Sequence, residues 1–241
     1  MSSKAQLMTR LGGEFHRIDH VAAPVDEGEV LRYLGYPSGV APSATLRTML
    51  TVWISEAAQL AAPRATYLVL SVTRLDAHRL VAQSTDGQTV EFRGAVGDYL
   101  VAADCVAAFV ATAGPAIEAL ASRLMCSGDP LAAMIVNAVG AERAEAAEAA
   151  ILDELRAAGR PLGFSPTLPY SPGYCGLPLT EQRTLFKLFA GSDVGVTLTE
   201  SCLMRPLKSI SGLIGLGLSD RVAAFGSPCD RCELYNCSMR R

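Results

Sequence analysis

The stretch of sequence that decides the fold lies near the C-terminus and reads, from residue 198 to residue 218, LTESCLMRPLKSISGLIGLGL. Its second half, residues 209–218, is a mostly apolar run of strand length, which predicts a buried strand. The glycines of this run lack the strand–turn–helix context of a dinucleotide-binding loop, so they belong to the strand. A further strand is predicted just upstream, over residues 194–199, VGVTLT.

More strands are expected in the first half of the chain. Residues 65–75 include TYLVLSVT, which is rich in β-branched and aromatic side chains. Two short alternating runs follow, at 79–83 and 89–92, with an Asp86-Gly87 turn between them. Residues 105–114, CVAAFVATAG, are typical of a buried strand. These runs together predict an antiparallel sheet.

Helices are expected between and after these strands. The signals are apolar residues at helical spacing, an Asp or a Gly-Pro at the start, and Gly or Pro after the end. Residues 1–26 show no clear period and predict a loop. The fold class is therefore α+β, a central, mainly antiparallel twisted sheet with flanking helices. We expect an N-terminal extension (1–26), a main domain (27–218) and a cysteine-rich tail (219–241), with helices near 29–36, 43–61, 115–128, 129–158 and 179–190.

Composition narrows the class of protein. Half of the 241 residues are hydrophobic and 19% are charged, which is enough to bury a sizeable core. The formal net charge is −3 and the pI is near 5.7, so there is no basic field for nucleic acid. No run reaches the 18 or more apolar residues of a spanning helix, and the N-terminus lacks a signal-like apolar segment. We therefore expect a cytoplasmic protein with no nucleic-acid or membrane partner.

Two segments carry a resemblance to a known family. They are SPGYCGLP at 171–178 and LTESCLMRPLKSISG at 198–212. Their order and spacing resemble the activation (reactivation) domain of cobalamin-dependent methionine synthase, and the resemblance covers roughly residues 27–216. The matching positions are Pro172, Gly173, Tyr174, Thr199, Glu200, Ser201, Met204, Pro206, Ser209, Ser211 and Gly212.

The resemblance implies a stand-alone reactivation protein for a corrinoid-dependent methionine synthase. In that family the domain binds S-adenosylmethionine and docks over the corrinoid, so that inactive cob(II)alamin is reduced and remethylated. The cobalamin would be carried by the partner, a methionine synthase or a related methyltransferase. An electron donor such as flavodoxin or ferredoxin would complete the system, and any enzymatic activity would be part of B12-dependent methyl transfer.

The same resemblance implies site residues. Ser171, Gly173 and Tyr174 would contact S-adenosylmethionine through backbone groups and an aromatic face. A carboxylate from the long helix would face the sulfonium, and Glu145 is the best match, with Glu148 as its competitor. The corrinoid would be faced by Tyr174, Glu200, Ser201 and Met204.

One position departs from the family pattern. The family loop begins with an arginine that pairs with the ligand carboxylate, whereas this chain has Pro169, which has neither a donor nor a charge. The sequence therefore also allows an alternative function, that of a non-catalytic module that binds a corrinoid protein or S-adenosylmethionine. Glu200 and Ser201 could equally cap the bend after the strand.

The cysteines suggest a metal. Cys229, Cys232 and Cys237 form a C-x2-C-x4-C pattern that suits a [4Fe-4S] cluster or, alternatively, zinc, and unligated thiols are the third reading of the same spacing. Cys175 and Cys202 are the candidates for a fourth ligand, because each lies inside a family motif. A cluster would make the chain an iron–sulfur redox activator of other corrinoid methyltransferases. The remaining cysteines, Cys105 and Cys126, are expected to be core thiols.

Overall fold

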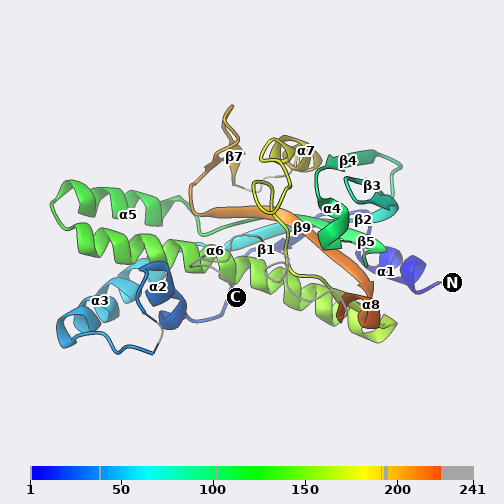
Figure 1. Ribbon diagram of the computed structural model, residues 1–241. Coiled ribbons are helices and arrows are strands. Elements are labelled where there is room, and N and C mark those ends of the chain that lie inside the picture. Colours follow the sequence, from blue (N-terminus) through cyan, green and yellow to red (C-terminus); the bar gives the residue numbers. More distant parts are fainter. Residues whose placement is uncertain (1, 38, 101, 191, 193–194, 224–241) are drawn as a thin grey trace.

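The chain folds as a twisted antiparallel sheet with helices on both sides (Figure 1). The computed structural model describes residues 2–37, 39–100, 102–190, 192 and 195–223. The helices are α1 (Ser3–Leu11), α2 (Glu27–Tyr33), α3 (Ala44–Leu60), α4 (Val96–Leu100), α5 (Pro115–Cys126), α6 (Pro130–Gly159), the short 3-10 helix η1 (Arg160–Leu162), α7 (Glu181–Leu188) and α8 (Ser219–Ala223). The strands are β1 (His16–Ile18), β2 (Arg64–Asp76), β3 (Arg79–Gln83), β4 (Thr89–Arg93), β5 (Cys105–Thr112), β6 (Phe164–Pro166), β7 (Thr197–Leu198), β8 (Met204–Arg205) and β9 (Ser209–Leu218).

The main sheet has seven strands in the order β4-β3-β2-β5-β9-β6, with β1 paired to β2 beside this path. Every pairing is antiparallel. The central strand β5 is buried along its whole length, because both of its faces are covered. Strands β7 and β8 form a separate two-stranded sheet. The predicted antiparallel sheet and the predicted α+β fold class are both confirmed.

Alternation along the strands produces two cores, one on each face of the sheet. On the first face, Phe109 and its same-face neighbours pack against α6 and α1. On the second face, Val106, Ala108 and Val110 pack against α4, α7 and the β3–β4 hairpin. A third core lies between α2, α3, α5 and α6. In Figure 1, α6 therefore runs along one side of the sheet, while α7 and the β7–β8 hairpin lie on the other.

The long helix α6 joins the first and third cores. It begins at an Asp129 cap, whose carboxylate accepts a hydrogen bond from the Ala132 N–H at 3.0 Å, and Pro130 follows at the first position. Its 30 residues extend over about 45 Å. A Cβ on Gly140 would lie 2.8 Å from Ile117 Cγ2, so the absence of a side chain lets α5 pack closely against α6.

The expectation of a loop over residues 1–26 was wrong. Residues 3–11 form α1, and Ser2 caps it by accepting a hydrogen bond from the Ala5 N–H. Leu7 and Leu11 are buried on one side of α1 in the first core, and β1 adds a strand beside β2. An i, i+4 pair of leucines behind a serine cap is the signal that predicts this helix.

The other predicted helices and strands are confirmed, with ends that differ by a few residues. The exception is the strand expected over 194–199, where the described residues form only Thr197–Leu198, in the small hairpin outside the main sheet. Within the residues the structure describes, no helix is both long and apolar enough to cross a membrane.

Candidate functional site

The loop of residues 170–178 is fixed to the edge of the main sheet. Tyr170 and Leu213 of β9 exchange two backbone hydrogen bonds of 2.9 Å each. Inside the loop, the Gly173 N–H donates to the Leu177 carbonyl at 2.8 Å, and the Leu177 N–H donates to the Tyr174 carbonyl at 2.9 Å. The loop is thus a closed, hydrogen-bonded turn, and its sequence supplies the conformation it needs, since Gly173 has a positive φ of 94°.

Tyr174 is exposed on the outside of this loop. The residue is 69% exposed, the highest value among the exposed large hydrophobic residues in the part of the chain that the structure describes. Ser171, by contrast, lies close to the backbone of β9. A Cβ on Gly212 would lie 3.0 Å from Ser171 Oγ and 2.8 Å from the Tyr170 carbonyl oxygen. The glycine of the Ser-x-Ser-Gly pattern therefore makes room for the Pro-Gly-Tyr loop, which links the two motifs physically.

The second motif begins in the β7–β8 hairpin. Its turn contains Glu200, Ser201 and Cys202, of which the first two are exposed and Cys202 is buried with a φ of +63°. Thr199 Oγ1 lies 3.1 Å from Ser201 Oγ and accepts a hydrogen bond from the Leu203 N–H at 3.0 Å. The hydroxyls of this turn thus stabilise the bend.

Arg183 of α7 connects this turn to the rest of the site. Its Nε donates to Cys202 Sγ at 3.3 Å, and its Nη2 donates to the Glu200 carbonyl. The hydrogen bond to Cys202 raises the pKa of the Arg183 guanidinium above its ordinary value, and the electrostatic effect of the Cys202 sulfur is the next largest cause. Arg183 was not among the predicted residues, and its role depends on a contact across 19 residues that no local pattern indicates.

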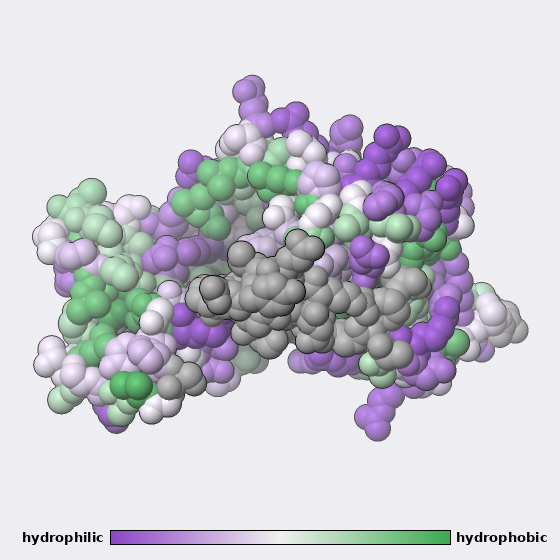
Figure 2. All heavy atoms as spheres, viewed as in Figure 1, coloured by the Kyte–Doolittle hydropathy of each residue, from purple (hydrophilic) through white to green (hydrophobic). Residues whose placement is uncertain are grey.

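The two motifs meet on the second face of the sheet. Cys175 from the loop and Met204 from β8 both pack against the core cluster that contains Tyr170 and Leu177. Figure 2 shows apolar side chains gathered between the base of the β7–β8 hairpin and α7. The exposed large apolar residues of this part of the chain are Leu168, Tyr174, Leu179, Leu203 and Leu207. We call this set the motif surface.

Glu145 lies on α6 and is held by α2. Its Oε1 accepts a hydrogen bond from the Tyr33 hydroxyl, and its Oε2 lies 3.5 Å from Arg32 Nη2. Burial, and then the hydrogen bond to Glu145, raise the pKa of Tyr33. The carboxylate thus has neighbours on α2, whereas the contacts described for Ser171, Gly173 and Tyr174 lie within the loop and with β9. Glu148, its competitor, is partly buried one turn later on the same helix.

The cysteines fall into different environments. Cys105 is buried, as predicted, but Cys126 is exposed at the end of α5, so the expectation of a core thiol there was wrong. Cys229, Cys232 and Cys237 lie outside the described residues. Among the described residues, no group of three or more His, Cys, Asp or Glu side chains could hold a metal. The metal site therefore stays a prediction.

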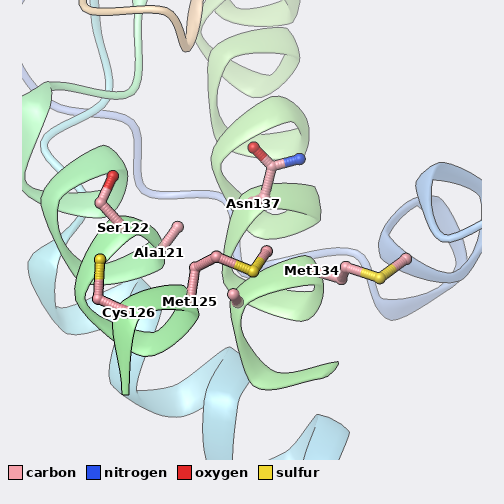
Figure 3. Close-up of a pocket in the computed structure, with 7 residues that line it drawn as sticks. Ala121, Ser122, Met125, Cys126, Met134 and Asn137 are labelled. Carbon is pink, nitrogen blue, oxygen red and sulfur yellow. The ribbon is translucent and has the colours of Figure 1, made fainter. Parts of the chain in front are cut away.

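A hollow of about 440 Å³ lies between α5 and α6, away from both motifs (Figure 3). In this view Ser122 and Asn137 both point upward, Met125 points toward α6, Met134 points away from α5, and Cys126 lies to the left of Met125, farther from α6. The three sulfur-bearing side chains therefore do not converge on one point. None of the predicted site residues lines this hollow, which is formed by Ala121, Ser122, Met125, Cys126, Ala133, Met134 and Asn137.

The donor set fits one half of S-adenosylmethionine better than the other. An exposed aromatic ring suits a sulfonium, because the ring face carries partial negative charge. Loop carbonyls and hydroxyls offer acceptors and donors for an adenine edge. At the carboxylate end, Pro169 has neither an N–H nor a charge, so the loop provides no counterpart of an arginine there.

Comparison with known proteins gives a family match over part of the chain and a likeness of fold. Residues 166–223 match the family model described as "Vitamin B12 dependent methionine synthase, activation domain". A solved structure described as the MetH reactivation domain bound to AdoHcy has the same fold, with a TM-score of 0.68 and 16% sequence identity. The match covers 87% of this chain and 81% of that one. A search of curated proteins gives no match.

Proposed function

We propose that this chain reactivates a corrinoid-dependent methionine synthase. Its fold is that of the methionine synthase reactivation domain, and residues 166–223 match that family's sequence pattern. The corrinoid would be carried by a partner protein. One electron from a flavodoxin- or ferredoxin-type donor would reduce cob(II)alamin, and S-adenosylmethionine would then give its methyl group to the reduced cobalt and leave as S-adenosylhomocysteine.

The observation that carries this proposal is the meeting of the two motifs. The Pro-Gly-Tyr loop and the Thr-Glu-Ser hairpin are separated in sequence, yet Cys175 and Met204 pack on the same core cluster. The segments that carry the two motifs expose Tyr174 and several leucines, and exposed apolar residues of this kind suit an interaction site. A flat macrocycle with polar edges suits an apolar surface flanked by Glu200 and Ser201.

The motif residues have distinct tasks in this proposal. Tyr174 would present its ring to the sulfonium. Glu145, the carboxylate that the resemblance implies, is held by Tyr33 and Arg32 of α2 and has no described contact with the loop, so we give it no task at the sulfonium. Met204, which is only partly buried, would form part of the surface that covers the corrinoid. The Thr199–Ser201 hydroxyl pair would keep the hairpin in shape.

The test is a remethylation assay. The chain, a corrinoid-loaded methionine synthase without its own activation domain, S-adenosylmethionine and a reductant are mixed without oxygen, and the loss of the cob(II)alamin absorbance is followed. The chain should accelerate this loss, and Tyr174→Ala should slow it at least tenfold. Tyr36→Ala is the matched control, since Tyr36 follows α2, outside both motifs.

Two results would change the assignment. Absence of any acceleration, together with tight binding of S-adenosylmethionine in calorimetry, would favour a non-catalytic binding module. Acceleration that Tyr174→Ala and Tyr36→Ala reduce equally would separate the activity from the loop.

A metal-dependent variant of this function is supported by the C-x2-C-x4-C pattern at Cys229, Cys232 and Cys237. We propose Cys175 as the fourth ligand in preference to Cys202, because Cys202 is buried whereas Cys175 is partly exposed. Iron uptake during anaerobic reconstitution, read as absorbance near 400 nm, tests this. Cys175→Ser should lower the iron content and Cys202→Ser should not. A protein that takes up no iron would exclude the cluster, and zinc analysis would then decide the alternative.

A further inference from the structure

We infer that Tyr170 and Tyr99 form a positioning pair, which holds the 171–178 loop in the conformation that presents Tyr174 to the methyl donor. The inference rests on the proposed function, and it deepens that function by naming two residues that hold the loop in place. Neither tyrosine touches the ligand in this proposal. Both act through the shape of the loop.

Tyr170 is the anchor of the loop. Its backbone is paired in both directions with Leu213, and its side chain is only 2% exposed. From this fixed position, its hydroxyl donates a hydrogen bond of 2.9 Å to the carbonyl of Cys175, five residues further along the chain. One side chain thus joins the start of the loop to the residue directly after Tyr174.

The bond is placed where the backbone needs support. Cys175 has a φ of +47°, which a residue with a Cβ adopts only when its surroundings impose it. The hydroxyl of Tyr170 holds the carbonyl of this same residue, and the neighbouring Gly173–Leu177 hydrogen bond closes the turn. As a result, Tyr174 lies at the outside of a turn whose two ends are both fixed.

Tyr99 supports Tyr170 from the other side. The two rings are stacked, with their centroids 4.5 Å apart and their planes 22° apart. Tyr99 belongs to α4, and the residues just before α4 also contact the loop. The Ala95 N–H donates to the Gly176 carbonyl at 3.1 Å, and a Cβ on Gly94 would lie only 2.7 Å from that same carbonyl oxygen.

The support therefore comes from residues 94–99, which lie outside the segment that matches the family model. Burial, and then the proximity of Tyr99, raise the pKa of the Tyr170 phenol.

The first experiment removes only the hydroxyl. Tyr170→Phe should weaken binding of S-adenosylmethionine about fivefold in calorimetry, the effect of losing one neutral hydrogen bond. Hydrogen exchange should accelerate in the peptide that covers residues 171–178 of the ligand-free protein. The matched control is Tyr67→Phe, because Tyr67 is equally buried and its hydroxyl donates to Glu154 at 2.9 Å, but against α6. This control should leave both readings unchanged.

The second experiment tests the stack. Tyr99→Phe keeps an aromatic ring and should retain binding and loop protection, whereas Tyr99→Ala should reduce both. Equal behaviour of the two variants would overturn the role of Tyr99. Unchanged exchange of the loop in Tyr170→Phe would overturn the role of Tyr170.

The exchange measurement uses no ligand, so it separates this inference from the proposed function. If the unmodified chain fails to bind S-adenosylmethionine, the proposed function loses its methyl donor. Faster exchange in Tyr170→Phe would in that case still establish the contact between Tyr170 and the loop, while removing its link to the ligand.

Discussion

Arg183 of α7 and Cys202 of the β7–β8 turn are joined by a hydrogen bond of 3.3 Å from Nε to Sγ. The same guanidinium donates to the Glu200 carbonyl, so a single side chain fixes the turn that carries the Thr-Glu-Ser motif. Because α7 directly follows the Pro-Gly-Tyr loop, this contact holds the β7–β8 hairpin in a fixed position relative to that loop.

We predict that Arg183→Met slows cob(II)alamin remethylation several-fold while leaving thermal unfolding nearly unchanged. The guanidinium lies at the surface, so its contribution to global stability is small. Its loss nevertheless releases the hairpin from α7. Arg156→Met is the control, since Arg156 makes an exposed ion pair with Asp153 on the opposite side of the sheet. An unchanged remethylation rate in Arg183→Met would show that the hairpin does not depend on this contact.

A second prediction concerns the buried ion pair between Glu142 and Arg143. The two side chains are 6% and 5% exposed, and Arg143 Nε lies 2.6 Å from Glu142 Oε2. Arg143 also donates to the carbonyls of Ala23 and Pro24, and Glu142 accepts a hydrogen bond from the Asp26 N–H. This network fastens the segment before α2 to the middle of α6.

Removing one partner leaves the other charge buried and unpaired. Arg143→Met should therefore lower the free energy of unfolding in urea by about 3–5 kcal/mol. The double variant Glu142→Leu/Arg143→Met removes both charges and should recover part of that loss. A double variant as unstable as the sum of the two single variants would contradict this account.

Much of the fold could be predicted because its signals are local. The strands are β-branched runs bounded by turns, and α6 has an Asp cap, a Pro start and a Gly end. The helix α1 was missed because it is short and polar, and only two of its leucines are buried. Cys126 was wrongly predicted to be buried, because an apolar residue in an apolar helix is typical of a core. It is exposed because it lies at the end of α5.

The candidate site was predictable only in part, for a related reason. Motif residues could be found from their order and spacing, but the residues that support them act across the fold. From the sequence, Glu142 looks like one more surface glutamate of an alanine-rich helix. Its buried carboxylate instead accepts a hydrogen bond from the Asp26 N–H, more than a hundred residues away. Tyr99 and Arg183 belong to neither motif, so only the tertiary structure links them to the site.

Cys105 provides a prediction about pH. Burial raises the pKa of its thiol to about 11 from an ordinary value of 9.0. The folded state therefore holds this proton more tightly than the unfolded chain. The stabilisation is complete below about pH 9 and is lost as the pH rises through about 11.

The unfolding free energy of the unmodified protein should consequently fall more steeply between these pH values than that of Cys105→Ala. Urea unfolding at about pH 8 and about pH 10.5 measures the difference. Alkylation gives an independent reading, because exposed Cys126 should react in the native protein, whereas Cys105 should react only after unfolding. Rapid native alkylation of Cys105 would contradict its burial.

The position of Pro169 allows a test that improves the site instead of damaging it. Pro169 immediately precedes the anchor Tyr170, and the resemblance places at this position an arginine that pairs with the ligand carboxylate. Pro169→Arg adds a charged, forked donor, and a charge-assisted hydrogen bond contributes about 1.5–3 kcal/mol. We therefore expect S-adenosylmethionine to bind about tenfold more tightly, or better, in calorimetry, while the affinity for S-adenosylmethionine methyl ester should change little.

Pro169→Lys separates the effect of charge from that of geometry, because lysine restores the positive charge without the forked guanidinium. If Pro169→Arg leaves the affinity unchanged while the fold is intact, the carboxylate lies elsewhere, and the ligand orientation assumed from the resemblance does not hold for this chain.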